Sequence, residues 1–138
     1  MNILKIHPDA VAPTYAHPDD ACFDLRAVSL RPSAPDTVTF GTGLAFDVPK
    51  GHVMLVFSRS GHGFNDDVRL ANCVGVIDPG YSDEVLVKLR ADGDHWPDFK
   101  PGDRIAQALV LPVERQEFTV VDELPESTRT GGFGSTGQ

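Results

Sequence analysis

A short segment near the end of the chain combines groups that bind phosphate and a nucleobase. The segment from Arg129 to Gly137 holds one guanidinium, several glycine amides, two adjacent hydroxyls and one aromatic ring. Glycine amides can approach anionic oxygens, arginine grips phosphate in bidentate fashion, and phenylalanine stacks on a base. No lysine follows the glycines, so this is not a P-loop. The composition predicts a clamp on a nucleotide, although a disordered terminus is the ordinary interpretation of a glycine-rich end.

A second candidate anion site lies in the stretch from Phe57 to Gly63. There Arg59, the Ser60 hydroxyl and the Gly61 amide could converge on one phosphate group. Taken alone, the stretch is more simply a polar turn after a strand.

A third segment, from Asn72 to Tyr81, ends an apolar run with Asp78, Pro79 and Gly80. This order predicts the turn of a β-hairpin. Asp78 is most simply a turn former that bonds its own backbone. A carboxylate held beside a tyrosine ring could also orient and deprotonate a water molecule.

Three more polar residues stand among apolar neighbours. Arg104 and Gln107 are three residues apart, which predicts opposite faces of a strand and different roles. Arg104 could pair with Asp103, whereas a buried Gln107 needs a hydrogen-bonding partner. Asp24 would need a metal or an arginine if it were buried. Exposure to solvent by strand alternation is its simpler interpretation.

Composition limits the classes of function. The chain has 138 residues and 41% hydrophobic residues, enough for one domain with a core. Its 12 basic and 20 acidic residues give a net charge of -8, which argues against general nucleic-acid binding and requires any phosphate site to be locally basic. No apolar run approaches a membrane span or a signal peptide, so we expect a soluble, cytoplasmic protein with no membrane partner. Cys22 and Cys73 lack metal-ligand spacing, and we expect reduced, partly buried thiols.

The elements that must position these groups are predominantly strands. Proline and glycine interrupt the sequence too often for helices of ordinary length. The predicted strands are Ile3 to His7, Cys22 to Val28, Val38 to Val48, His52 to Ser58, Val74 to Ile77, Glu84 to Arg90, Ile105 to Val110 and Glu117 to Val121. Many short strands predict an all-β single domain, a sandwich, jelly roll or barrel.

The domain organisation divides near residue 125. Residues 1–124 form the predicted β domain. Residues 125–138 are rich in Ser, Thr and Gly, with Phe133 as their large apolar group, and cannot pack a core alone. We expect a flexible glycine-rich arm that closes over the active site.

Together, five segments in this order resemble the five motifs of the trimeric dUTP pyrophosphatase family. The segments are Ala21 to Leu25, Ser58 to Gly61, Gly75 to Tyr81, Gly102 to Gln107 and Gly131 to Gly137. They span nearly the whole chain, and the opening stretch from Lys5 to Thr14 also looks like the family's first strand. Cys22 stands where the first motif usually has glycine, and Arg129 lies one residue closer to Phe133 than is usual in the fifth motif.

The resemblance implies a jelly-roll-like β-clip fold, a homotrimer with shared active sites, and hydrolysis of dUTP to dUMP and pyrophosphate with Mg²⁺. Asp78 would activate the water that attacks the α-phosphorus, Ser60 would stabilise developing charge, and Gln107 would hold phosphates or the attacking water. Asp24 would contact the metal ion through water molecules, and the ion would be held mainly by the triphosphate. The implied substrate-binding residues are Arg59, Ser60, Gly61, Asn72, Gly75, Val76, Ile77, Asp78, Tyr81, Gln107, Arg129, Phe133, Gly134, Ser135 and Thr136.

Three alternatives remain open at this point. A dCTP deaminase of the same fold needs a glutamate acid/base in its pocket, whereas this chain carries Asp78 and Tyr81 as the pyrophosphatases do. A nucleotide-responsive regulatory protein would have no need of a water-activating carboxylate. A structural jelly roll with a disordered end would show no ordering of its tail by nucleotide.

Overall fold

The fold was derived from a computed structural model, which describes residues 1–128 and 131. Within these residues the chain forms short strands and one helix. The strands are β1 (Asn2–Lys5), β2 (Phe23–Arg26), β3 (Ser29–Ala34), β4 (Thr37–Gly41), β5 (Leu44–Asp47), β6 (His52–Phe57), β7 (Val68–Leu70), β8 (Gly75–Ile77), β9 (Leu86–Ala91) and β10 (Arg104–Pro112), and the helix is α1 (Ser60–Asp66).

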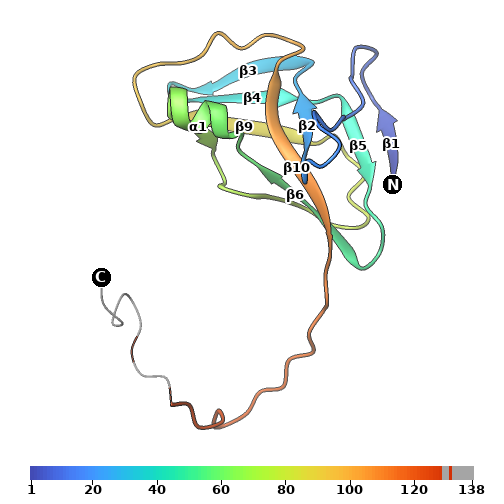
Figure 1. Cartoon of the computed structure of the whole chain (residues 1–138), viewed down its shortest axis with the longest axis vertical. Coiled ribbons are helices and arrows are strands. Elements are labelled where there is room, and N and C mark those ends of the chain that lie inside the picture. Colours follow the sequence, from blue (N-terminus) through green and yellow to red (C-terminus); the bar gives the residue numbers. More distant parts are fainter. Residues whose placement is uncertain (129–130, 132–138) are drawn as a thin grey trace.

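Two four-stranded sheets form the body (Figure 1). One has the order β2-β10-β6-β8, the other has the order β3-β4-β9-β7, and β1 pairs separately with β5. All pairings are antiparallel, and most neighbours in a sheet are distant in the sequence. The prediction of an all-β, jelly-roll-like fold is therefore confirmed.

Strand alternation builds the core. In β2, Phe23 and Leu25 are buried, whereas the intervening Asp24 is only partly buried on the opposite face. In β9, Val87 and Leu89 are buried, and the intervening Lys88 is exposed. Because successive side chains of a strand point to opposite faces, each sheet presents one apolar face to the other. The same alternation leaves Asp24 on the outer face, where it can take part in a site.

The predicted strand from Val38 to Val48 is instead two strands. Gly43 has a φ of 66°, a left-handed conformation that glycine adopts without strain, and the chain bends there between β4 and β5. A Cβ at Gly43 would lie 2.7 Å from the Cβ of His7, so a larger residue at this bend would clash with its neighbour.

Three short elements escaped prediction. The strand β3 contains Pro32, but it lies at the edge of its sheet, where a missing N–H is tolerated. The segment after β6 is the helix α1 rather than a polar turn, and it leads directly into the three-residue strand β7. No residue of α1 is buried, so it has no apolar face to reveal it in the sequence.

The predicted strand from Glu117 to Val121 is wrong. Residues 113–128 form no helix or strand and are exposed, and Figure 1 shows them as an extended arm that leaves the body after β10. Phe118 is 93% exposed and Val120 is 98% exposed. β-Branched and aromatic residues favour a strand only when a neighbouring strand supplies hydrogen bonds, and residues 117–121 pair with no strand among the described residues. None of the helices in the described residues is long and apolar enough to cross a membrane.

Thr42, between β4 and β5, gives a test of how the bend between these strands is held to the residue that precedes β9. Its fully buried hydroxyl donates to the Val85 carbonyl at 2.8 Å and accepts from the Leu44 N–H at 3.2 Å. Thr42→Val keeps the shape but leaves both partners unsatisfied, so we expect the free energy of unfolding to fall by about 2–3 kcal/mol.

Denaturant unfolding at one fixed protein concentration measures this loss. Thr42→Ser is the matched control. It keeps the hydroxyl and removes one methyl group, and we expect a loss of about 1 kcal/mol. A smaller loss for the valine variant than for the serine variant would contradict the role of the hydroxyl.

Candidate active site

One buried ion-pair group organises the outer face of the first sheet. Asp24 Oδ1 accepts from Arg59 Nε at 2.9 Å, and Asp24 Oδ2 accepts from Arg104 Nη1 at 3.2 Å. The Asp24 side chain is only 14% exposed, so its charge requires this compensation. The simpler expectation, an Asp24 that faces solvent, is therefore wrong, as is the pairing of Arg104 with Asp103.

A β-bulge in β10 places Arg104 and Gln107 on the same side. Arg104 pairs with Arg26 and Ala106 pairs with Leu25, so Ile105 is an extra residue on β10. Ile105 and Ala106 are consecutive and both buried. The predicted opposite faces for Arg104 and Gln107 are therefore wrong, because the regular alternation on which the prediction relied is interrupted between them.

Gln107 has the hydrogen-bonding partner that the sequence demanded. Its Nε2 donates to the Ser58 carbonyl at 3.0 Å. Because that carbonyl can only accept, the amide nitrogen must face it, and the Gln107 carbonyl oxygen stays available as an acceptor. The Ser58 hydroxyl in turn accepts from the Leu70 N–H at 2.8 Å, which joins the end of β6 to β7 in the other sheet.

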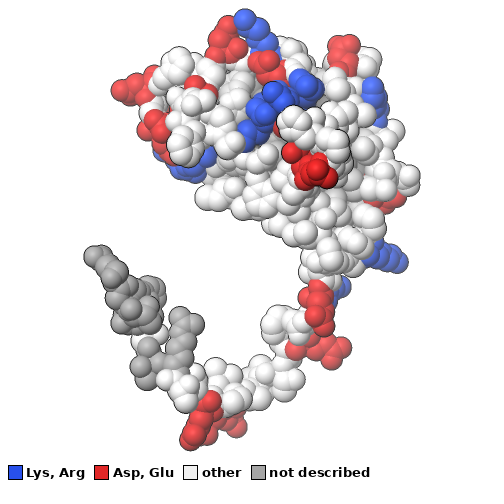
Figure 2. All heavy atoms as spheres, viewed as in Figure 1, with Lys and Arg blue, Asp and Glu red and all other residues white. Residues whose placement is uncertain are grey.

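These groups line one cavity of about 300 Å³. Asp24, Arg59, Arg104 and Gln107 form one side of its lining, and Cys22 is among the remaining residues. Basic side chains gather over the upper part of β10 in Figure 2. The cavity is lined by two arginines, Arg59 and Arg104, and two aspartates, Asp20 and Asp24, so it offers oriented guanidiniums to a phosphate without a net positive charge.

The first residues of α1 follow Arg59, which lines this cavity. Arg59 is the N-cap residue, with extended backbone and no side-chain capping hydrogen bond, and the exposed Ser60 and Gly61 follow it. The Ser60 hydroxyl and the unpaired first N–H groups of the helix therefore come directly after Arg59 in the chain.

Cys22 is a free thiol beside the same cavity, and Cys73 is also free. Partial burial raises the pKa of the Cys22 thiol, and the negative charges of Asp20 and Asp24 raise it further. The thiol therefore stays protonated over a wider pH range than an ordinary cysteine. Cys73 is exposed, contrary to the expected partial burial.

Asp78 lies in a tight turn that carries the chain between the two sheets. The Tyr81 N–H donates to the Asp78 carbonyl at 3.2 Å, and Gly80 has a φ of 90°. Pro79 and Gly80 are the residues that such a turn favours. The predicted turn is correct but the hairpin is not, because β8 pairs with β6 whereas the next strand, β9, pairs with β4 and β7.

The residues around this turn line two further hollows. Asn72, Gly75 and Ile77 line a cavity of about 420 Å³. Asp78 is exposed and lines a larger cavity of about 830 Å³, whose other charged or titratable residues are Lys50, His52 and Arg115. Val76 lies between the two cavities and belongs to both linings.

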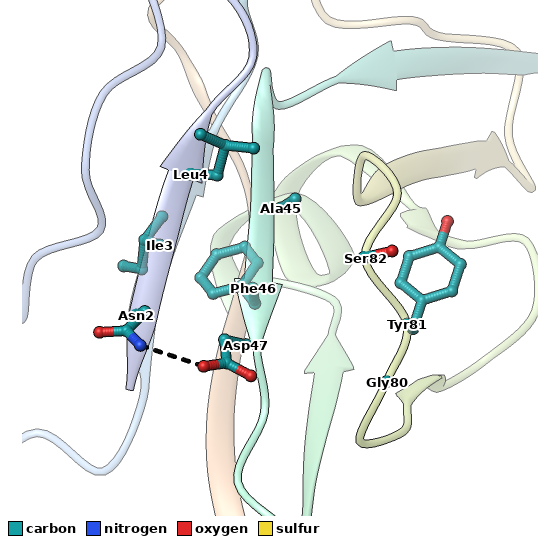
Figure 3. Close-up of a pocket in the computed structure, with 9 residues that line it drawn as sticks. All are labelled: Asn2, Ile3, Leu4, Ala45, Phe46, Asp47, Gly80, Tyr81 and Ser82. Carbon is teal, nitrogen blue, oxygen red and sulfur yellow. Dashed lines mark hydrogen bonds between the residues drawn. The ribbon is translucent and has the colours of Figure 1, made fainter.

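Tyr81 faces a different hollow, of about 350 Å³, shown in Figure 3. Its ring lies across from β1 and β5, where Asn2 Nδ2 donates to Asp47 Oδ2 at 3.0 Å. The Tyr81 hydroxyl donates to the Glu84 carbonyl at 3.0 Å, which fixes the direction of the ring.

On one chain the predicted site residues therefore form two sets. The first set surrounds Asp24 and Arg59, and the second surrounds Asp78. Arg129, Phe133, Gly134, Ser135 and Thr136 lie outside the described residues. Ser58 was missed as a partner of Gln107, because its contribution is a backbone carbonyl that no side-chain pattern reveals.

The described residues contain no group of three or more His, Cys, Asp or Glu side chains arranged to hold a metal ion. Asp24 already accepts one hydrogen bond on each oxygen. A carboxylate offers about four lone-pair sites, so each oxygen can still accept from a metal-bound water. Asp24 can therefore contact a hydrated cation through the water molecules of that cation.

The chain resembles known proteins in family, sequence and fold. The family model described as dUTPase matches residues 9–137. A deoxyuridine 5'-triphosphate nucleotidohydrolase of Picosynechococcus is 40% identical over 99% of this chain and 98% of its own length. The corresponding protein of Helicobacter hepaticus is 42% identical over 99% of this chain and 88% of its own length.

Solved structures show the same fold. A mutant dUTPase of Staphylococcus bacteriophage 80alpha, bound to dUpNHpp, superposes with a TM-score of 0.86 at 22% identity, over 99% of this chain and 98% of that chain. A mutant dUTPase of the S. aureus phage phi11, which coordinates a structural Mg(II) ion, gives a TM-score of 0.78 at 20% identity, over 91% of this chain and 98% of that chain.

Proposed function

Because this chain belongs to the dUTPase family, we propose that it hydrolyses dUTP to dUMP and pyrophosphate. The observation that carries the proposal is similarity over almost the full length of both chains to proteins named for this reaction. Those names favour hydrolysis over deamination of dCTP. In the cytoplasm the reaction would keep uracil out of DNA and supply dUMP for dTMP synthesis.

The cavity around Asp24 is the proposed site for the phosphates. Arg59 and Gln107 both line it, and Ser60 and Gly61 follow Arg59 in the chain. Arg59 offers charge, Ser60 and Gly61 offer a hydroxyl and an amide, and Gln107 offers an oriented acceptor for a water molecule. Their fixed positions would stabilise charge as it develops on the leaving pyrophosphate.

The proposed cofactor is Mg²⁺ bound chiefly by the triphosphate. When bound, the ion would neutralise phosphate charge and hold the phosphates for in-line displacement. The chain's contribution would be Asp24, whose remaining lone pairs can accept hydrogen bonds from metal-bound water molecules.

Asp78 is the proposed general base. It is exposed on a rigid turn, so its carboxylate is free to accept a proton from a water molecule. The water oxygen would form a bond to the α-phosphorus while the bond from phosphorus to the bridging oxygen breaks. Pyrophosphate then leaves with the released electron pair.

Asn72 and the backbone of Gly75, Val76 and Ile77 are proposed to recognise the edge of uracil. Their hollow lies beside the Asp78 turn. Uracil lacks the 5-methyl group of thymine and presents different donors from cytosine, so a narrow slot can discriminate against both. Tyr81, held by its bond to the Glu84 carbonyl, would pack under the deoxyribose and exclude a 2′-hydroxyl.

A homotrimer would bring the two sets of residues together at shared sites. The outer face of β6, β8 and β10 supports association, because it carries Val53, Leu55 and Leu109 in partly exposed positions, with Val76 58% exposed and Leu111 43% exposed. Figure 2 shows this face as a broad uncharged surface over the lower part of β10 and β6. Burying such a surface between copies is favourable.

The arm is proposed to reach a neighbouring subunit. Phe118, Val120 and Leu124 are exposed by more than four-fifths and need apolar partners that a neighbour could supply. Beyond them, Arg129, Ser135 and Thr136 would bind the γ-phosphate, while Phe133 and Gly134 would cover the uracil ring. The site would thus close only after the substrate binds.

The substrate assignment predicts strong selectivity. With Mg²⁺, the purified protein should release pyrophosphate from dUTP at least ~100-fold faster, as kcat/KM, than from dTTP, dCTP or UTP. A coupled pyrophosphate assay measures all four nucleotides, and excess EDTA should suppress the dUTP reaction. Comparable rates on the four nucleotides would refute the assignment, and ammonia release from dCTP would favour deamination.

If Asp78 is the general base, its loss should lower kcat and leave substrate binding almost unchanged. Asp78→Asn should lower kcat by about 10²–10⁴-fold, because the neutral amide cannot accept the proton. Binding of a non-hydrolysable imido analogue of dUTP, measured by calorimetry, should change by less than about threefold. Asp83→Asn removes a neighbouring exposed carboxylate and serves as control. Full activity of the Asp78 variant would exclude this mechanism.

If the arm has this role, closure of the active site and assembly of the trimer should depend on different parts of it. Deleting residues 128–138 should lower kcat/KM for dUTP by ~100-fold or more, because phosphate positioning is lost. Sedimentation should still give a trimer, since Phe118 to Leu124 remain. Removal of Gln138 alone is the control. Normal turnover after the longer deletion would show that the tail does not close the site.

A further inference from the structure

His62 joins α1 to the start of β10. Its Nε2 lies 2.8 Å from the Arg104 carbonyl oxygen. A carbonyl oxygen can only accept, so Nε2 carries the proton and donates. The bond therefore connects α1, which follows Arg59, to Arg104. The guanidiniums of Arg59 and Arg104 both bind the Asp24 carboxylate.

Ring packing fixes the direction of this bond. The His62 ring contacts Phe99 edge to face, with centroids 4.9 Å apart and planes at 79°. Phe99 in turn packs against the fully buried Phe40 at 5.4 Å and against Trp96 at 6.1 Å. His62 is thus anchored to the core through an aromatic stack rather than lying loosely on the surface.

Little else in the described residues attaches α1 to the body. None of its residues is buried, so hydrophobic burial does not position it. The side chain of His62 is 18% exposed, whereas the neighbouring Phe64 is 93% exposed. Asp66, one turn later on the same helix, lies 3.7 Å from His62 Nδ1, too long for a hydrogen bond.

We propose that His62 is a positioning residue for the triphosphate site. By fixing α1 against β10, it sets Arg59, Ser60 and Gly61 relative to Gln107. It touches neither substrate nor reacting atoms and acts through the residues at the start of the helix. The inference deepens the proposed function, on which it rests.

Two variants separate the hydrogen bond from the packing. His62→Leu keeps an apolar side chain against Phe99 but cannot donate to the Arg104 carbonyl. His62→Gln places an amide nitrogen at nearly the same reach as Nε2 and restores the donor. Asn65→Ala, at an exposed position of the same helix, is the matched control.

Steady-state kinetics with dUTP should give a split between binding and turnover. For His62→Leu we expect KM to rise by about 3- to 12-fold, within the range for loss of one hydrogen bond, with kcat within about threefold of the unmodified protein. Inhibition by dUMP, which lacks the β- and γ-phosphates, should change by less than about twofold. His62→Gln and Asn65→Ala should both keep a KM close to that of the unmodified protein.

An unchanged KM for His62→Leu, no rescue by glutamine, or an equal loss of dUMP binding would overturn the proposal.

Hydrogen exchange tests the positioning without relying on dUTP hydrolysis. Amides of residues 63–66, which have acceptors within the helix, should exchange at least ~5-fold faster in His62→Leu, with β6 and β10 unchanged and with glutamine restoring slow exchange. Unchanged exchange in the leucine variant would overturn the proposal. If the unmodified protein failed to hydrolyse dUTP while exchange behaved as expected, the proposed function would fail and the anchoring role of His62 would remain.

Discussion

The Asp24 carboxylate is the constraint on which the site depends. It is nearly buried, and an uncompensated charge there would be prohibitively costly, so it must hold two guanidiniums. Arg59 reaches it from the end of β6 and Arg104 from the start of β10, so one anion fixes the relative position of two distant segments. The three groups together carry a charge of +1, from two positive groups and one negative. A phosphate therefore meets cations that are already oriented, and binding requires little reorganisation.

Much of the architecture follows from local sequence rules. Alternation in β2 and β9 and the turn residues Pro79 and Gly80 are sufficient to predict an all-β domain and its main strands. The rules fail where pairing depends on distant segments. β3 contains a proline that only an edge position tolerates, and the stretch from Glu117 to Val121 has the composition of a strand without a neighbour on its own chain. Strand propensity describes a surface that is suited to pairing, not a partner that is present.

The site was predictable in its residue types more than in its geometry. Motif resemblance identified Asp24, Arg59 and Gln107, and the structure brings these three around one cavity. An arginine was one of the two partners expected for a buried Asp24, but the Ser58 carbonyl that binds Gln107 and the bond from His62 to the Arg104 carbonyl, 42 residues away in the sequence, were not predicted, because backbone acceptors leave no side-chain pattern. Asp78 and its neighbours form a separate set. The exposed apolar surfaces of the chain provide a physical reason for the assembly that would bring the two sets together.

The extra residue in β10 has a consequence for how this strand can change over evolutionary time. Ile105 shifts the alternation by one position, and only with that shift do Arg104 and Gln107 share a face. Substitution of Ile105 by another apolar residue preserves the count of residues and hence the direction of every side chain around it. Loss or gain of one residue anywhere between Arg104 and Gln107 would reverse one of the two directions, whatever the residues involved. The strand is therefore expected to tolerate drift in composition but not in length, so that alignments of related chains should place gaps outside this interval.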